Sequence, residues 1–511
     1  MANRDQNAFP PTKYGNCALA DRLLLLALLV NSCLAIIHVY RLLAYRVHST
    51  PWEEAIFLSA TRFRTIEQTY SVSNLQHPPY WISAYSPLYY ATLRAVMDLT
   101  PSTIAIGRYL STAGVVVVVA ALFRSPQPQR AWSLSSLFSP LLFLSIFPVL
   151  CLSVSYFKPE FIAMPFSLLA FMSYAGRGLS SQKPWVLRTS ALAATAVLFK
   201  FTALGALIGI SAHLLWDRRY KDAIRFVACV VGPVILVYAF LEVSVGSGIW
   251  TMTISGNALK LSLLVIVDYL GNKYLANALV IAAIASCMPL LARSMGKRNA
   301  EAAMAFYFLA SFFLFAFACG KPGSSYNYFL ESGIGLALVI PAALHSLCLR
   351  HEIEGYRMFV ALLILALAVN LKSLHGIVNV NWSASIDHEG VSRTLSTVRI
   401  PSGTYVMADA AYVMDVVQAG HVPLINDNYL YSLMVINGKI PGGQVMRALT
   451  EGQISYVLLA HPLKHYAQLA GQWWPLDVVA YVEQHYSCEA VMGSGGDTGA
   501  VGCTPRDGPQ P

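Results

Sequence analysis

Long apolar stretches separated by short charged connectors run through the chain as far as residue 378. Hydrophobic residues make up 56% of the sequence and charged residues only 12%, about half the charged fraction of soluble proteins. About eleven of these stretches approach the length that crosses a bilayer as a helix. The predicted spans cover residues 23–40, 102–123, 134–152, 161–174, 186–198, 201–216, 223–245, 275–291, 302–319, 329–349 and 358–377. The sequence therefore predicts a polytopic α-helical membrane protein.

The basic residues alternate between connectors, and this alternation predicts the orientation in the membrane. Among the short connectors, one alternate set carries most of the basic residues: Arg4, Lys13, Arg22, Arg124, Arg130, Arg177, Lys183, Arg188, Arg218, Arg219, Lys221, Arg225, Arg293, Lys297, Arg298, Arg350 and Arg357. Connectors rich in Lys and Arg stay in the cytoplasm. We therefore expect a multi-pass protein of the cytoplasmic (inner) membrane, with its N-terminus inside and its last region outside. The net charge of +9 reflects these connectors, so no nucleic-acid partner is expected.

Two regions, 41–101 and 379–511, are too long to be simple connectors. In the first, residues 52–63 and 87–99 predict helices that lie in the membrane interface. In the second, 404–408 and 455–460 predict strands, and the helix expected at 410–419 indicates a small α/β fold. We therefore divide the chain into a membrane domain, 1–378, which includes the external loop 41–101, and a soluble extracytoplasmic domain, 379–511.

The cysteines fall into two classes. Seven of the nine lie singly in or beside apolar segments, where a cysteine behaves as a small hydrophobic residue. Cys488 and Cys503 instead flank a glycine-rich turn in the C-terminal region. A disulfide between them is expected if that region lies in an oxidising compartment.

Several motifs of known chemistry are missing from the sequence. It has no GxxxxGK[ST] phosphate loop, no CxxC or HExxH, no cluster of histidines and no GxSxG. The sequence thus gives no sign of an ATP-driven pump, a tightly bound zinc or a serine hydrolase. No cofactor is expected from it, and no metal ligands are assigned.

Ionisable residues recur at the external ends of the predicted spans. They are Glu53, Glu54, Lys158, Glu160, Lys200 and Glu331. An ionisable group near hydrocarbon costs about 2.5–3.5 kcal/mol. Any single lysine among them can be explained by its side chain reaching up to the headgroups. Together, at one membrane face, they predict an outward-opening polar cavity. Such a cavity suits an anionic, lipid-attached substrate, with lysines for a phosphate and a carboxylate to accept a proton.

Six short segments, in order along the chain, carry a resemblance to a known family. They are 53–55 (Glu-Glu-Ala), 85–90 (Tyr-Ser-Pro-Leu-Tyr-Tyr), 107–111 (Gly-Arg-Tyr-Leu-Ser), 158–160 (Lys-Pro-Glu), 200–203 (Lys-Phe-Thr-Ala) and 327–331 (Asn-Tyr-Phe-Leu-Glu). The chain resembles the GT-C membrane glycosyltransferases, the fold of the aminoarabinose–lipid A and protein O-mannosyl transferases. It looks most similar to their bacterial relatives with no assigned acceptor.

The resemblance implies an inverting transfer of a sugar from a polyprenyl-phosphate carrier to a lipid or glycan acceptor outside the membrane. The family's catalytic acid lies in the first external loop, which matches Glu53 or Glu54; Ala55 replaces the glycine that follows the acid in some relatives and leaves that choice open. Some relatives use a divalent metal and others do not.

The remaining site residues also follow from the resemblance. It assigns Lys158 and Lys200 to the donor phosphate. The residues expected to contact substrate are Tyr85, Tyr89, Glu160, Asn327 and Glu331.

Three other functions are compatible with the same residues. A transporter is the main alternative, although we find neither the inverted repeats nor the paired interrupted helices typical of that class. A polymerase or ligase of lipid-linked glycans would share the donor but not the early acid pair. In an inactive module, Glu53 and Glu54 would be only the N-terminal charges of a helix.

Overall fold

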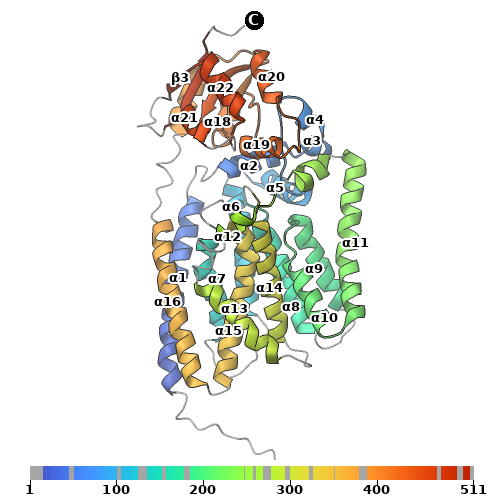
Figure 1. Cartoon of the computed structure of the whole chain (residues 1–511), viewed down its shortest axis with the longest axis vertical. Coiled ribbons are helices and arrows are strands. Elements are labelled where there is room, and N and C mark those ends of the chain that lie inside the picture. Colours follow the sequence, from blue (N-terminus) through green and yellow to red (C-terminus); the bar gives the residue numbers. More distant parts are fainter. Residues whose placement is uncertain are drawn as a thin grey trace, which may run out of the picture.

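We describe the fold from a computed structural model of the chain. The residues it describes are 15–44, 51–100, 105–124, 135–151, 157–177, 185–246, 248–256, 260–268, 278–293, 300–321, 326–349, 352–378, 388–468, 473–491 and 499–506. In this part of the chain a bundle of long helices carries a smaller α/β region at one end (Figure 1).

Each predicted span corresponds to a helix of the bundle. The helices are α1 (Gly15–Ala44), α6 (Ala105–Phe123), α7 (Ser135–Cys151), α8 (Glu160–Arg177), α9 (Trp185–Phe199), α10 (Gly205–Trp216), α11 (Tyr220–Val245), α13 (Ala278–Arg293), α14 (Ala300–Ala318), α15 (Leu330–Leu349) and α16 (Ile353–Val378). Six of the described helices are long and apolar enough to cross a membrane, and shorter apolar helices accompany them. The predicted polytopic helical class is confirmed.

Burial separates central helices from lipid-facing ones. The apolar window of α15 is 89% buried, whereas that of α11 is only 17% buried. Small residues allow the central helices to approach closely, as is common in membrane bundles. A Cβ on Gly209 would lie 2.7 Å from the Cα of Tyr307, and one on Gly335 would lie 2.7 Å from the Cα of Phe308. Glycine is therefore required where α10 and α15 cross α14.

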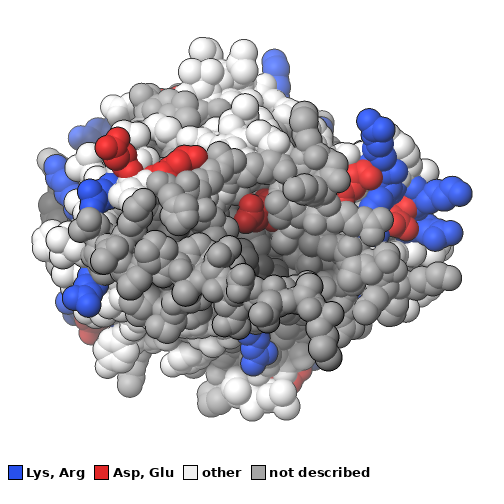
Figure 2. Space-filling model, turned by 90° about the horizontal axis from the view of Figure 1, so that it is seen from below, with Lys and Arg blue, Asp and Glu red and all other residues white. Residues whose placement is uncertain are grey.

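Arginine and lysine side chains project around the rim of the end opposite the α/β region (Figure 2). The junction between α10 and α11, which carries Arg218 and Arg219, lies at this end (Figure 1). The connectors that the sequence analysis placed in the cytoplasm include this junction.

Short helices of the external loop lie between the bundle and the α/β region (Figure 1). They are α2 (Pro51–Arg62), α3 (Ile66–Tyr70), α4 (Ser73–Gln76) and α5 (Pro87–Leu99). The π-helix Trp250–Ser255, α12 (Leu263–Asp268) and the 3-10 turn Tyr326–Phe329 also belong to the connectors. Helix α5 has the predicted bounds. Helix α2, expected at the membrane surface, is instead covered, and Glu53, Glu54 and Ala60 are fully buried.

The C-terminal region is a small α/β fold. Its elements are α17 (His388–Thr397), β1 (Tyr405–Ala408), α18 (Val413–Gln418), α19 (Asn428–Ile436), α20 (Gln444–Thr450), β2 (Ile454–Leu459), α21 (Leu463–Gln468), α22 (Leu476–His485), β3 (Tyr486–Ala490) and β4 (Val501–Pro505). The strand order is β1-β2-β4-β3. β1 and β2 are parallel, while β4 is antiparallel to both β2 and β3. A disulfide joins Cys488 of β3 to Cys503 of β4.

The external loop and the C-terminal region share one hydrophobic core. Ile56, Tyr90 and Leu93 belong to the same buried cluster as Val457 and Val482. This shared core explains why α2 is covered, since its apolar face is buried by the C-terminal region as well as by the bundle.

Polar contacts tie the same two regions together. The Tyr80 N–H donates to the Leu424 carbonyl at 2.7 Å. The Asn426 side chain accepts from the Ile82 N–H at 2.8 Å and donates to the Ser59 hydroxyl at 3.2 Å. The predicted domain boundary at 378/379 adjoins residues 379–387, which lie outside the described residues.

Candidate functional site

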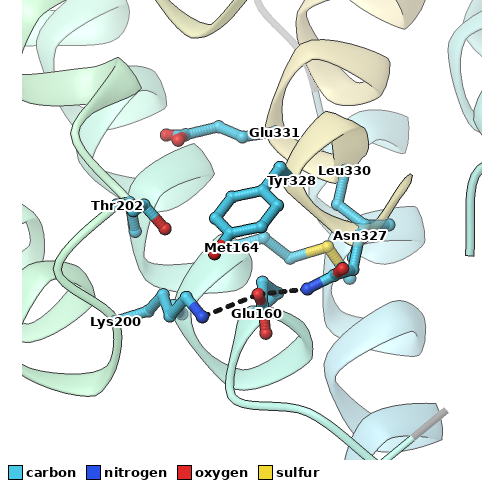
Figure 3. A pocket seen from close by; sticks show the side chains of 10 residues that line it. Glu160, Met164, Lys200, Thr202, Asn327, Tyr328, Leu330 and Glu331 are labelled. Carbon is cyan, nitrogen blue, oxygen red and sulfur yellow. Dashed lines mark hydrogen bonds and ion pairs between the residues drawn. The ribbon is translucent and has the colours of Figure 1, made fainter. Parts of the chain in front are cut away.

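A buried cluster of charged side chains lies where three membrane helices begin or end. Glu160 opens α8, Lys200 directly follows α9, and Asn327 lies in the 3-10 turn before α15. The Lys200 ammonium lies 2.9 Å from Glu160 Oε1, and the Asn327 amide donates to the same oxygen. Figure 3 shows these side chains converging on one pocket. The structure thus brings together three residues predicted for the site.

Aromatic rings and a second acid complete the pocket. It is lined by Glu160, Ala163, Met164, Lys200, Thr202, Ala203, Asn327, Tyr328, Leu330 and Glu331. The Lys200 ammonium lies 4.8 Å from the ring centroid of Tyr85 and 5.2 Å from that of Tyr328, distances at which a cation is attracted to a π face. Lys200 is therefore held between an acid and two rings.

Lys158 belongs to the same electrostatic group. It is 6% exposed, and burial lowers its pKa to about 8, while the carboxylate of Glu160 opposes that shift. Lys200 and Asp427 are among the other charges that act on it. Two lysines at this end of the pocket provide ammonium groups of the kind that bind a phosphate.

Asp427 brings the C-terminal region to this group. Its side chain caps α19 by accepting from the Leu430 N–H at 2.9 Å. Burial raises its pKa to about 6, and the positive charge of Lys158 partly counteracts the effect. Sequence reasoning missed this residue. The run Asn426-Asp427-Asn428 within an apolar stretch is the signal that could have found it.

Glu331 and Tyr89 have structural contacts in addition to their predicted place at the site. Glu331 accepts from the Ser167 hydroxyl and, at 3.2 Å, from the Gly205 N–H at the start of α10. Tyr89 is 1% exposed and its ring lies 5.8 Å from that of Tyr85. Glu331 therefore lines the pocket and also accepts a hydrogen bond from the start of α10. Tyr89 is buried and packs against the ring of Tyr85.

Glu53 forms a fully buried ion pair with Arg108. Arg108 donates through Nη2 to Glu53 Oε2 at 2.6 Å and through Nε to Oε1 at 3.2 Å, and neither side chain is exposed. A third donor of Arg108 reaches the Leu42 carbonyl at 2.9 Å. Both oxygens of Glu53 are thus engaged in joining α2 to α1 and α6.

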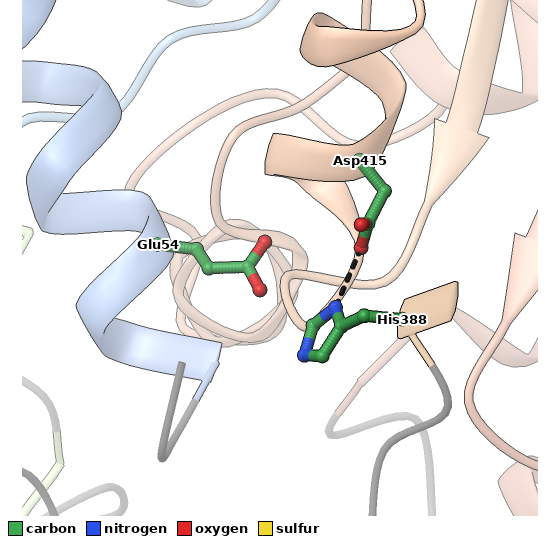
Figure 4. A group of neighbouring side chains, drawn as sticks. All are labelled: Glu54, His388 and Asp415. Atoms are coloured by element: carbon green, nitrogen blue, oxygen red, sulfur yellow. Dashed lines mark hydrogen bonds and ion pairs between the residues drawn. The ribbon is translucent and has the colours of Figure 1, made fainter. Parts of the chain in front are cut away.

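Glu54 turns the other way, toward the C-terminal region. Its Oε2 accepts from the Met414 N–H at 2.9 Å. Its ligand atoms, with those of His388 and Asp415, lie within 4.8 Å of one another, as Figure 4 shows. Burial first, and then the negative charge of Asp415, raise the pKa of Glu54 well above its ordinary value. The charges that act on Glu54 are thus a different set from those that act on Lys158.

Comparisons with known proteins were made at the levels of sequence and structure. No protein-family model matches the sequence, and no curated protein matches it. Among solved structures, ArnT from Cupriavidus metallidurans in the apo state aligns with 96% of this chain and 98% of its own, at 12% identity and a TM-score of 0.56. The same protein bound to undecaprenyl phosphate aligns over the same shares at 11% identity and a TM-score of 0.53.

The alignment spans the bundle, the external loop and the C-terminal region alike, because it covers nearly all of both chains. Its low identity shows a shared architecture and does not assign an activity. The chain therefore has the fold of ArnT, the GT-C membrane fold that its sequence resembles.

Proposed function

We propose that this protein is a glycosyltransferase that moves a sugar from a polyprenyl-phosphate carrier to an acceptor hydroxyl. The buried cluster of Lys158, Lys200, Glu160 and Asn327 carries the proposal, because its two lysines and its amide are groups that can bind a phosphate. The fold is that of ArnT, one of whose structures holds undecaprenyl phosphate. A carrier of the same chemical class is the natural donor to test here.

In the proposed reaction the acceptor oxygen attacks the anomeric carbon in line and inverts its configuration. A carboxylate takes the hydroxyl proton as the new C–O bond forms. The bond from the anomeric carbon to the carrier phosphate breaks, and the phosphate leaves with the bonding pair. Lys158 and Lys200 offset its negative charge, and Tyr85, Asn327 and Glu160 shape the sugar site.

We assign the role of general base, which accepts the proton of the acceptor hydroxyl, to Glu54 rather than to Glu53. Arg108 donates to both oxygens of Glu53, so the guanidinium already occupies that carboxylate. Burial and the nearby Asp415 charge raise the pKa of Glu54, which makes it the more basic carboxylate of this region. Asp427 is the competing carboxylate because it lies in the electrostatic surroundings of Lys158.

The same proposal places the C-terminal region outside the cytoplasm. Basic side chains lie around the opposite end of the molecule (Figure 2), and the Cys488–Cys503 disulfide suits an oxidising compartment. Alkaline phosphatase fused to the C-terminus should be active, whereas green fluorescent protein fused there should not fluoresce. The reverse result would place this region inside.

Carrier binding tests the function directly. We would purify the protein in nanodiscs and measure retained polyprenyl phosphate by native mass spectrometry. Lys158→Ala/Lys200→Ala should abolish retention, whereas Lys260→Ala, a change at an exposed lysine, should leave it unchanged. Glu54→Gln should keep the carrier, since it removes only the proton acceptor.

Two further outcomes sharpen the result. Given a sugar-loaded carrier and a mixed pool of membrane lipids, wild type should release free carrier phosphate while Glu54→Gln should not. If Asp427→Asn abolishes release and Glu54→Gln does not, Asp427 is the base. If wild type binds no carrier, the chain shares only the fold and the transporter alternative becomes the leading one.

A further inference from the structure

The turn between helices α10 and α11 carries exposed basic side chains. Four basic residues and two acids lie between residues 217 and 225. Arg219 is engaged within the protein, because its guanidinium lies 2.7 Å from the Asp222 carboxylate and 5.6 Å from the ring centroid of Trp185. The other three basic residues are exposed and have no acidic partner among the described residues: Arg218, Lys221 and Arg225. Their charges are therefore available to a ligand.

Arg218 has a backbone conformation that is unusual for a residue with a side chain. Its φ of 57° lies in the left-handed region, and no other described residue except glycine has a positive φ. The N–H of Arg218 donates to the Leu215 carbonyl at 3.0 Å, and that of Arg219 to the Leu214 carbonyl at 2.8 Å. Helices that end in this way usually have glycine at the left-handed position. An arginine there points to a role for its side chain.

Two exposed aromatic residues flank the basic group. Trp216, the last residue of α10, is 43% exposed, and Tyr220, the first residue of α11, is 57% exposed. Trp and Tyr favour the boundary between the hydrocarbon and the headgroups of a bilayer. The two rings therefore set the depth of the turn in the membrane, and they hold the neighbouring basic side chains at the level of the lipid phosphates.

Helix α11 continues from this turn along the lipid. Only 17% of its apolar window is buried. Lys221 and Arg225 lie one turn apart on one side of the helix, and the residues that follow on that side are small: Ala228, Cys229 and Gly232. A Cβ added at Gly232 would have no neighbour within 4 Å. An acyl chain can therefore lie against this side of α11 without meeting a large side chain.

We propose that Arg218, Lys221 and Arg225 bind the headgroup phosphate of an anionic phospholipid, with one acyl chain of the lipid along α11. Basic residues beside a membrane helix attract anionic lipids, and a guanidinium binds a phosphate through paired N–H groups. A soluble anion would use the charges but neither the aromatic rings nor the lipid-facing helix, so the combination favours a lipid. Lys200 precedes α10 and this turn follows it, so the two lie at opposite ends of that helix (Figure 1). The proposal is independent of the transfer reaction.

Lipid retention by the full-length protein tests the site. We would remove the bound lipid, offer phosphatidylglycerol and phosphatidylcholine in equal amounts, and compare the lipid retained by native mass spectrometry. Wild type should prefer phosphatidylglycerol. Arg218→Ala/Lys221→Ala/Arg225→Ala should reduce this preference by about 100-fold, from about fivefold for each basic residue. Equal retention of the two lipids by wild type, or an unchanged preference in the folded triple variant, overturns the proposal.

A matched control removes the same charge elsewhere in the bundle. Arg22→Ala/Arg124→Ala/Arg357→Ala changes three exposed arginines of α1, α16 and the end of α6. This variant should keep the preference for phosphatidylglycerol. If it loses as much as the first triple variant, the attraction comes from the overall charge of this end of the bundle, and the specific site is wrong.

Two further arms identify the ligand. Gly232→Phe leaves every charge in place and fills the side of α11 where the acyl chain would lie, so it should lower the retention of phosphatidylglycerol. Unchanged retention would contradict the lipid assignment. Undecaprenyl phosphate is offered separately. If the turn retains that lipid and not phosphatidylglycerol, the site belongs to a polyprenyl carrier and the proposal is wrong.

Hydrogen–deuterium exchange on wild type needs no variant. In nanodiscs of phosphatidylglycerol, backbone N–H groups of residues 214–225 should exchange more slowly than in nanodiscs of phosphatidylcholine. The end of α6, which carries the exposed Arg124, should exchange at the same rate in both. Equal exchange at residues 214–225, or equal slowing at both places, overturns the site.

Discussion

The Lys158–Lys200–Glu160 cluster and the Glu54–His388–Asp415 cluster are both buried, yet their charges are arranged in opposite ways. In the first, an acid lies 2.9 Å from one lysine and acts on the second. In the second, two acids share one imidazole. The first holds two lysines around the Glu160 carboxylate, and Asp427 also acts on one of them. The second has an excess of negative charge.

This difference indicates what each cluster is suited to receive. Buried lysines whose charge is partly offset by a carboxylate can still bind an anion. A buried pair of acids is unfavourable when empty and improves when a cation arrives. The fold thus places buried lysines at the ends of the membrane helices and two neighbouring acids beneath the C-terminal region.

Removing the acid of the first cluster should produce the largest effect. Glu160→Ala leaves Lys158 and Lys200 buried without a counter-charge, and breaking such a pair costs about 3–5 kcal/mol. We expect a large fall in the apparent Tm of the detergent-purified protein. Glu67→Ala, at an exposed acid of α3, is the control. An unchanged Tm for Glu160→Ala would show that the ion pair of Glu160 does not stabilise this cluster.

Asp427→Asn should have a smaller, pH-dependent effect. The folded-state pKa of about 6 lies above the ordinary value of 3.8. Ionisation above pH 6 therefore costs the folded state about 1–3 kcal/mol, and that cost disappears below the unfolded value. The variant should be more stable than wild type at pH 7.5, by a margin that shrinks toward pH 4. A margin independent of pH would show that burial does not disfavour this carboxylate.

Glu54→Gln should give the smallest change, and of the opposite sign to Glu160→Ala. At pH 7.5 it removes one of two neighbouring buried acids while its amide oxygen still accepts from the Met414 N–H, so the apparent Tm should rise. The gain should vanish at low pH, where wild-type Glu54 is protonated. Glu53→Gln is the matched control and should lower the Tm by weakening the Arg108 pair.

Much of the fold could be predicted because it depends on local patterns. Residues 161–174 predict a span that the structure extends to Glu160–Arg177, and the helix predicted at 87–99 has those bounds. In the C-terminal region, 404–408 and 455–460 coincide closely with β1 and β2. The length of an apolar run and the alternation of apolar and polar residues are local properties, so they can be recognised in the sequence. The strands β3 and β4 were missed because their pairing depends on contacts across the sheet.

The candidate site was predicted only in part. Lys158, Glu160 and Lys200 were found because each is an ionisable residue at the end of an apolar span, where burying a charge is costly. Asn327 was assigned only through the family resemblance. Asp427 was missed because the polar run 426–428, although it interrupts an apolar stretch, lies far in sequence from the predicted membrane-helix ends. Glu53 and Glu54 were identified as a pair, but no pattern told which of them meets Arg108.

The sequence by itself determined the helical membrane class, the existence of a C-terminal α/β region and the polar helix ends, because all three are written in local composition. The tertiary structure alone decided how the acid pair divides. Adjacent residues on a helix point about 100° apart, so Glu53 faces Arg108 of α6 while Glu54 faces Met414, 360 residues away in sequence. Contacts at that separation depend on how the whole chain packs, and no local pattern encodes them.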